Sequence, residues 1–164
     1  ARHRLAIGPD ADLVLWRPPP CSDVYRNILS RAAPQRVHLL FVSGDPFRVP
    51  TLLQQLAGLA RYAIRTGRPT TLPELAAVLG VTETIVAHGL TWLERKGMVS
   101  VEEVREEILL REGQEPGPGE PGVVEKVLQR LLEEQTSYQQ FLRQSAKPGI
   151  QISRSLIHND PGGN

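Results

Sequence analysis

Residues 70–112 read TTLPELAAVLGVTETIVAHGLTWLERKGMVSVEEVREEILLRE and carry the most specific structural pattern in the chain. Thr71 is placed to cap a helix, because Pro73 falls in the first turn and Glu74 falls at the third helical position. The apolar stripe of this segment stops at Gly80, and glycine commonly ends helices. The pattern therefore predicts a short helix between Thr71 and Gly80.

A second helix follows a two-residue turn in the same stretch. Thr82 caps it, it runs through Lys96, and Gly97 ends it. Its predicted buried side consists of aliphatic residues at helical spacing: Ile85, Val86, Leu90 and Leu93. Two short strands, 98–104 and 107–111, then form a hairpin. Helix, turn, helix, glycine and hairpin is the plan of a winged helix-turn-helix.

A small β-α-β unit is predicted near the start of the sequence. Residues 12–16 form an apolar strand that three prolines close, since proline cannot donate to a strand ladder. Ser22 or Asp23 can cap a helix that ends before Pro34. Residues 36–42 are a near-continuous apolar strand of the kind buried on both faces. The simplest arrangement pairs the two strands in parallel.

A further amphipathic helix is predicted over residues 51–66, with Gly67 as its C-terminal stop. Arg61, Arg65 and Arg68 follow one stripe at its end. These arginines are candidates for binding an acidic peptide or a nucleic-acid backbone. The alternative needs no ligand, because cations at the C-terminal end of a helix interact favourably with its dipole.

Beyond the hairpin the sequence changes character. Residues 113–122, rich in glycine and proline, lack apolar periodicity and predict a flexible linker or long loop. The next helix has one narrow apolar stripe, which can dock on the chain's own core or pair with another helix. The chain is thus predicted to be of mixed α/β (α+β) class and to fall into five segments: a small α/β subdomain with a basic helix at 1–69, the winged helix-turn-helix at 70–112, the linker at 113–122, the C-terminal helix at 123–146 and a mobile tail at 147–164.

The 164 residues carry a formal net charge of +1, which hides an asymmetry. Residues 1–70 contain ten Lys and Arg against four Asp and Glu, whereas residues 71–164 contain nine against fourteen. All ten cations of the first part are arginines. A polyanion or acidic peptide is expected to bind this part more readily than the rest of the chain. A general preference for arginine over lysine in the source of the sequence would also explain why all ten cations are arginines.

Cys21 is the single cysteine, so no internal disulfide is expected. The sequence contains no N-terminal apolar run typical of a signal peptide, and no stretch near the roughly 20 apolar residues that span a bilayer. These features predict a cytoplasmic protein without a membrane partner. Because the chain opens at Ala1 and its only methionine is Met98, we expect it to be a piece of a longer polypeptide.

The sequence offers no constellation for catalysis or for metal binding. Both need converging His, Cys or carboxylate side chains, and the four histidines are far apart in sequence, at positions 3, 38, 88 and 158. Residues 43–45, Ser-Gly-Asp, follow a strand but lack the lysine and spaced glycines of phosphate-binding loops. Cys21 has no fixed basic neighbour in sequence and is expected to be a packed thiol rather than a nucleophile. We therefore predict no catalytic residue, metal, cofactor or small-molecule substrate for this chain.

The helix from Thr82 to Lys96 is the remaining candidate for nucleic-acid contact. If its aliphatic side is buried, its opposite face presents polar groups that can hydrogen-bond bases or phosphates. These are Thr84, His88, Thr91 and Arg95. The hairpin argues against this use, because its glutamates would repel phosphates. They are Glu102, Glu103, Glu106 and Glu107, beside Arg105. Packing or contact with a protein is the alternative use of the module.

Five features of the sequence can be compared with known families as a set. They are the strand DLVLWRPPP from Asp12, the helix around Tyr25, the strand PQRVHLLF from Pro34, the basic segment LARYAIR from Leu59 and the winged-helix segment. Together they resemble the C-terminal region of RecJ-type single-strand-specific DNA exonucleases, over roughly residues 10–145. The resemblance implies a parent enzyme that degrades single-stranded DNA from the 5′ end with two metal ions, usually manganese or magnesium. The Asp and His motifs that hold those metals do not occur in this sequence, so the ligands needed to activate water are missing.

The resemblance therefore implies a non-catalytic accessory domain in DNA repair and recombination. It would guide single-stranded DNA or dock a partner, such as the acidic tail of the single-strand-binding protein or a helicase. Arg61, Arg65 and Arg68 are the first candidates for that contact. The alternative is a fragment of a winged-helix transcriptional regulator, which would meet duplex DNA through the polar face of the second helix.

Overall fold

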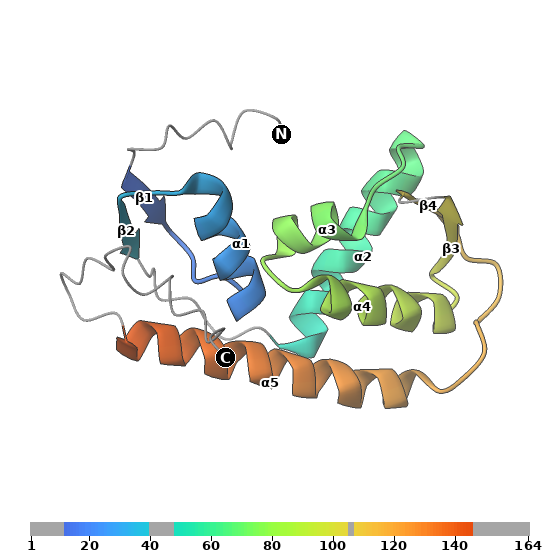
Figure 1. Ribbon diagram of the computed structural model, residues 1–164. Helices are drawn as coiled ribbons and strands as arrows, with labels where there is room; N and C mark the ends of the chain where they lie inside the picture. Colours follow the sequence, from blue (N-terminus) through green and yellow to red (C-terminus); the bar gives the residue numbers. More distant parts are fainter. Residues whose placement is uncertain (1–11, 40–47, 105–106, 146–164) are drawn as a thin grey trace, which may run out of the picture. The chain divides into compact units, whose positions relative to one another are not determined.

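The elements of the computed structural model are drawn in Figure 1. The chain falls into two compact units, and each unit has its own apolar cluster. The described residues are 12–39, 48–104 and 107–145. Unit 1 comprises residues 1–44 and 138–164, and unit 2 comprises residues 45–137. Within the described ranges the chain forms five helices and four short strands. The class is mixed α/β, as the sequence predicts.

Unit 1 contains two strands separated in sequence by a helix. β1 (Asp12–Leu15) pairs with β2 (Arg36–Leu39), and the pairing is parallel, as predicted. One face of the pair packs on α1 (Ser22–Ala32), since Leu13, Ala32 and Val37 form the buried cluster. Residues 40–42 of the predicted second strand lie outside the described residues.

The two ends of α1 differ from the sequence prediction. The N-cap is Cys21 in extended conformation, without a side-chain hydrogen bond to the helix. A cap by Ser22 or Asp23 is therefore wrong. Asp23 lies inside the first turn, where its carboxylate accepts a hydrogen bond from the Arg26 guanidinium at 2.7 Å. The negative charge of the carboxylate also interacts favourably with the positive end of the helix dipole. At the other end Ala33 has φ 39°, in the left-handed region that residues with a Cβ rarely adopt.

The last residues of α5 (Pro121–Ser145) belong to unit 1. There Gln139 donates from Nε2 to the carbonyl oxygen of Pro18 at 3.3 Å. The hydroxyl of Tyr25 is buried and has no hydrogen-bond partner among the described residues. Burial raises the pKa of Tyr25 above its ordinary value of 10.0. Burial is also the first cause of the raised pKa of Tyr138. Both phenols are therefore held in their neutral form.

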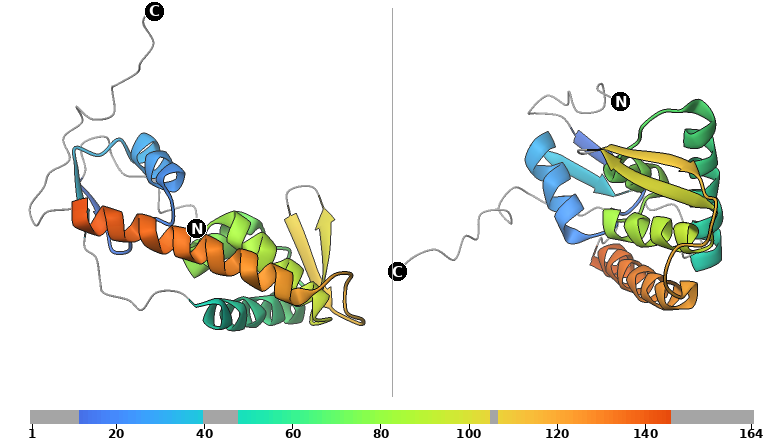
Figure 2. Two further views of the ribbon diagram at one scale, coloured as in Figure 1. Left: turned by 90° about the horizontal axis from the view of Figure 1, so that it is seen from below. Right: turned by 90° about the vertical axis from the view of Figure 1, so that its right-hand side faces the viewer.

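Unit 2 contains three further helices, a hairpin and the first part of α5 (Figure 1). α2 (Val49–Thr66) and α3 (Leu72–Leu79) both contact α4 (Glu83–Arg95). β3 (Val99–Val104) and β4 (Glu107–Glu112) run antiparallel, side by side in Figure 2. The sequence prediction places α2 in one segment, 1–69, with the β-α-β unit. This boundary is wrong, because α2 packs into the core of unit 2.

The core of unit 2 draws on all its helices. Its largest fully buried side chains are Leu52, Leu56, Ile85, Val86, Leu93, Leu128 and Leu132. Burying each such leucine contributes roughly 1.5–3 kcal/mol. α5 supplies Val124, Leu128 and Leu132, one residue per turn, to this cluster. Its apolar stripe thus docks on the chain's own core, the first of the two arrangements that the sequence leaves open.

The predicted caps of α3 and α4 are present. Thr71 Oγ1 accepts from the backbone N–H of Glu74, and the Glu74 carboxylate accepts from the backbone N–H of Thr71, both at 3.2 Å. Gly80 ends α3 with φ 71°, and Thr82 accepts from the backbone of Ile85 at 3.4 Å. These local bonds satisfy N–H groups that a helix leaves free at its start. The short helices therefore begin where the sequence predicts.

Two backbone pairings were not predicted. Thr70 and Ile108 exchange hydrogen bonds in both directions, at 3.0 and 2.6 Å, which forms an isolated antiparallel β-bridge beside β4. The Gly117 N–H donates to the carbonyl oxygen of Glu94 at 3.0 Å, which holds the 113–120 segment against the end of α4. Of the two predicted forms of this segment, the structure has the long loop.

The helices α2 and α4 approach closely at Gly89. A Cβ atom on Gly89 would lie 2.5 Å from Cδ2 of Leu56, a side chain with no exposed surface. Real Cβ atoms do not come this near, so any larger residue requires Leu56 to move within a packed core. The absence of a side chain at position 89 therefore sets the distance between the two helices.

Replacing Gly89 with alanine is expected to destabilise unit 2 by about 1 kcal/mol. Alanine favours a helix by roughly 0.5–1 kcal/mol, but forcing a methyl group into a packed site costs about 1–3 kcal/mol. In a Leu56→Ala background the sign should reverse, because the truncated side chain leaves room for the methyl group. Urea unfolding followed by Trp92 fluorescence, in chains that carry Trp16→Phe, measures the free energy of unfolding of four chains: the unaltered one, each single variant and the double variant.

The matched control is Gly58→Ala on α2, where a Cβ atom meets nothing within 4 Å. It is expected to stabilise the unit by roughly 0.5–1 kcal/mol. If Gly89→Ala stabilises the chain as much as this control does, the close contact with Leu56 is wrong.

Tyr25→Phe is expected to stabilise unit 1 by about 1 kcal/mol at neutral pH, because it removes a buried hydroxyl without a partner. A raised pKa means that the folded state favours the neutral phenol. That contribution is complete below pH 10.0 and is lost as the pH rises further. Tyr25→Phe should therefore also reduce the alkaline loss of stability.

Urea unfolding measured by circular dichroism at about pH 7 and about pH 11 checks both effects. Tyr62→Phe is the control, since Tyr62 is 55% exposed. Destabilisation by Tyr25→Phe at neutral pH would show that the hydroxyl has a partner after all.

Candidate functional site

The three candidate arginines lie in unit 2 and are exposed. Arg61 and Arg65 are one turn apart on α2, and the Arg65 guanidinium lies 5.9 Å from the centre of the Tyr62 ring, in cation-π range. Arg68 follows Gly67, the left-handed residue that ends the helix. The predicted single stripe therefore holds for Arg61 and Arg65 only.

The four polar residues predicted as a recognition face all lie on α4. Thr84 is exposed, while His88, Thr91 and Arg95 are half-buried. The hydroxyl of Thr91 donates to the backbone carbonyl of Ala87 at 3.0 Å. Thr91 is therefore engaged within its own helix.

Arg95 is engaged by the loop that leads to α5. Its Nη1 donates to the carbonyl oxygen of Glu120 at 3.0 Å. Its guanidinium also lies against Gly119, where an added Cβ would be 2.9 Å from Cζ. Arg95 thus ties the start of α5 to the end of α4, a role that the aperiodic loop sequence gave no means of predicting.

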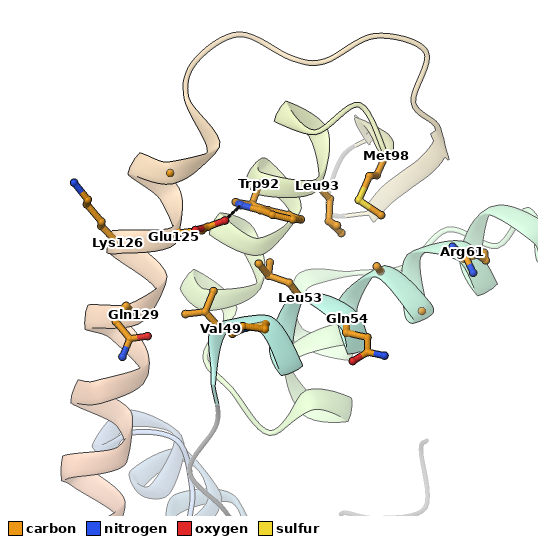
Figure 3. Close-up of a pocket in the computed structure, with 14 residues that line it drawn as sticks. Val49, Leu53, Gln54, Arg61, Trp92, Leu93, Met98, Glu125, Lys126 and Gln129 are labelled. Carbon is orange, nitrogen blue, oxygen red and sulfur yellow. Dashed lines mark hydrogen bonds between the residues drawn. The ribbon is translucent and has the colours of Figure 1, made fainter.

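An open groove of about 1070 Å³ lies between α2, α4 and α5 (Figure 3). We call it the α2–α5 groove. α2 lines it between Val49 and Arg61, and α5 lines it between Gly122 and Gln129. Trp92, Leu93 and Met98 complete the lining. All of these residues belong to unit 2, so one compact body forms the groove.

Trp92 connects two walls of the α2–α5 groove. Its indole Nε1 donates to the carboxylate of Glu125 on α5 at 2.9 Å (Figure 3), and Lys96 Nζ lies 5.4 Å from the ring centre. Trp92 is not among the residues predicted from the sequence. A signal was present, because Trp92 lies two turns after Ile85 on the side of the helix that faces the core.

The hairpin presents an acidic surface. Glu102, Glu103, Glu107 and Glu112 are exposed on it. Glu102 pairs with Arg111 at 2.8 Å. Arg105 and Glu106, the predicted turn, lie outside the described residues. The described part of the hairpin therefore carries a negative field that opposes phosphates.

The remaining candidate groups are dispersed. Among the described residues, no three His, Cys, Asp or Glu side chains lie together in a way that could hold a metal ion. His38 contacts Asp12 across the parallel strands at 3.3 Å. Residues 43–45, together with His3 and His158, lie outside the described ranges.

In the part of the chain that the structure describes, no single helix has both the length and the apolar composition to cross a membrane, and only α3 and α4 taken as a pair, with a bend of 101°, pass that test.

No family model matches this chain, and comparison with curated proteins and with solved structures gives no significant match.

Arg95→Ala is expected to lower the free energy of unfolding of unit 2 by about 1 kcal/mol, because a half-buried, charged donor to the Glu120 carbonyl is lost. Arg130→Ala, an exposed position on α5, removes the same charge and should change stability by less than about 0.5 kcal/mol. Urea unfolding of both variants measures the difference. Unchanged stability of Arg95→Ala, together with weaker DNA binding, would make Arg95 a contact residue instead.

Proposed function

We propose that this chain is a non-catalytic accessory domain of a single-strand-specific 5′–3′ DNA exonuclease, which guides single-stranded DNA or docks a partner protein. The distribution of charge in unit 2 carries the proposal. Arg61, Arg65 and Arg68 are exposed on one segment, whereas the hairpin exposes glutamates. The arginines attract an acidic peptide or the phosphates of a single strand, whereas the glutamates of the hairpin repel them. Such a role would be carried out in the cytoplasm.

We also propose that residues 70–112 form a winged helix-turn-helix to which α2 adds a first helix. The order α2, Thr70, α3, α4, β3 and β4 supports this. In this interpretation α4 is the recognition helix and the hairpin is the wing. The internal hydrogen bonds of Thr91 and Arg95 favour a packing role for α4.

The second candidate function, a transcriptional regulator that reads duplex DNA, has support from Thr84 and His88 only. Thr84 is exposed near the start of α4, and His88 is half-buried one turn later. Base readout requires free donors and acceptors, and two of the four predicted groups already have partners within the chain. The acidic hairpin would also lie beside the duplex. Partner docking is therefore the better supported function.

Combined replacement of Arg61, Arg65 and Arg68 by alanine is expected to weaken binding of single-stranded DNA at least about tenfold. Each lost phosphate contact lowers the slope of log affinity against log salt by roughly 0.7, so the slope should fall by about 2. Fluorescence anisotropy with an oligonucleotide of about 20 nucleotides measures both quantities. A peptide with the acidic tail of the single-strand-binding protein tests the protein partner in the same way.

The charge-matched control is a chain with alanine at Arg26, Arg31 and Arg36, three exposed arginines of unit 1. It should bind nearly as the unaltered chain does. Equal affinities for the two triple variants would remove Arg61, Arg65 and Arg68 from the site. DNA cleavage by the chain itself with added manganese would reject a non-catalytic domain.

A further inference from the structure

We infer that the α2–α5 groove binds an amphipathic helix that carries acidic residues beside its apolar stripe. The inference rests on the proposed docking function and adds the class of partner. It is built from the shape of the groove, the chemistry of its lining and the charges around it.

The α2–α5 groove has the length and the apolar floor that a helix needs. Its wall on α2, from Val49 to Arg61, spans about 18 Å, or roughly three turns. Leu53, Leu93 and the Trp92 ring face the space (Figure 3). Met98 is 45% exposed at its edge. Leu53 and Leu93 are buried beneath this floor, whereas Trp92 and Met98 offer partly exposed apolar surface in the groove. Such surface in an open groove marks a site for association, because water covers it at a cost in free energy.

The walls favour a helix over an extended peptide. They are formed mainly by helices, whose backbone groups are paired within each helix, and neither strand of the hairpin lines the groove. An extended peptide would leave its own N–H and C=O groups unpaired against apolar side chains, which is unfavourable. A helical partner satisfies those groups internally and offers apolar residues on one face.

The charges around the groove favour acidic flanks on the partner. Arg61 on α2 and Lys126 on α5 both line it, and Figure 3 shows the Lys126 side chain extending from α5 away from Trp92. The carboxylate of Glu125 is already bound by the Trp92 indole. The first turn of α2 borders the groove and contains no acidic side chain, so the positive end of its dipole is not offset within that turn. A partner with glutamates beside its apolar stripe complements Arg61 and Lys126, the two cations of the lining, which outnumber the one carboxylate there.

The test uses the full chain with Trp16→Phe, so that Trp92 reports on the groove. The probes are three designed peptides of about 18 residues that share one leucine stripe. The first has glutamates beside the stripe, the second has lysines there, and the third is the acidic peptide with two internal prolines that prevent a helix. The acidic helix should bind at least about tenfold more tightly than either of the others.

Two variants at position 58 separate groove binding from loss of fold. Gly58 lines the groove, and a Cβ atom there meets nothing within 4 Å. The Gly58→Gln variant should therefore fold. Its longer side chain would occupy space that the partner helix needs, so the affinity for the acidic helix should fall at least about tenfold. Gly58→Ala should change the affinity for the acidic helix by less than about twofold. Arg61→Glu should weaken the acidic helix about fivefold and strengthen the basic one.

Three results overturn the inference: equal binding of the acidic and basic helices, equal binding of the proline-containing peptide, or full binding by Gly58→Gln. Absence of binding at about 1 mM acidic peptide overturns it as well. Arg65 and Arg68 lie outside the groove lining, so their joint replacement by alanine should spare helix binding. A chain that binds the helix but neither single-stranded DNA nor the acidic tail would keep this inference and reject the proposed function. The reverse pattern would reject this inference alone.

Discussion

The contact between Leu56 of α2 and Gly89 of α4 is the constraint on which the rest of unit 2 depends. It allows the two helices to approach until only the Leu56 side chain lies between them at this point, and the neighbouring leucines then close the core on both sides. A closer approach buries more apolar surface and brings more atoms into dispersion contact. The same approach fixes where Trp92, three residues beyond Gly89, emerges between α2 and α5. The α2–α5 groove therefore follows from how the core is packed.

Much of the fold could be predicted from local signals. Local signals include the capping box of Thr71 and Glu74, the glycines at 67 and 80 that end helices, and the two short strands of the hairpin. Each of these acts over a few residues, so the sequence alone reveals them. The predicted capping residue of α1, Ser22 or Asp23, was wrong because Cys21 takes the cap position through its backbone conformation alone. The pairing of Thr70 with Ile108 joins residues far apart in sequence, and no local pattern encodes such a contact.

The candidate site shows the same division. Exposed arginines on α2 could be predicted because charge and helical spacing are local properties. The engagement of Arg95 by Glu120 could not, since a polar residue on a helix face looks alike in sequence whether it is free or bound by a distant loop. The groove was missed for a related reason: it needs three helices from different parts of the chain, and only packing brings Trp92 within reach of Glu125. Surfaces made by tertiary contact are thus the part that sequence patterns predict least.

The central claim is that α2, α4 and the first part of α5 form one cooperative body, which makes the groove a fixed surface. Native-state amide hydrogen exchange at Leu56, Leu93 and Leu128, all essentially buried, tests it most directly. If the three helices open together, the three amides exchange with the same free energy of opening and shift together under mild denaturant. An opening free energy at Leu128 lower than the other two by more than about 2 kcal/mol would show that α5 detaches independently, and would contradict the account.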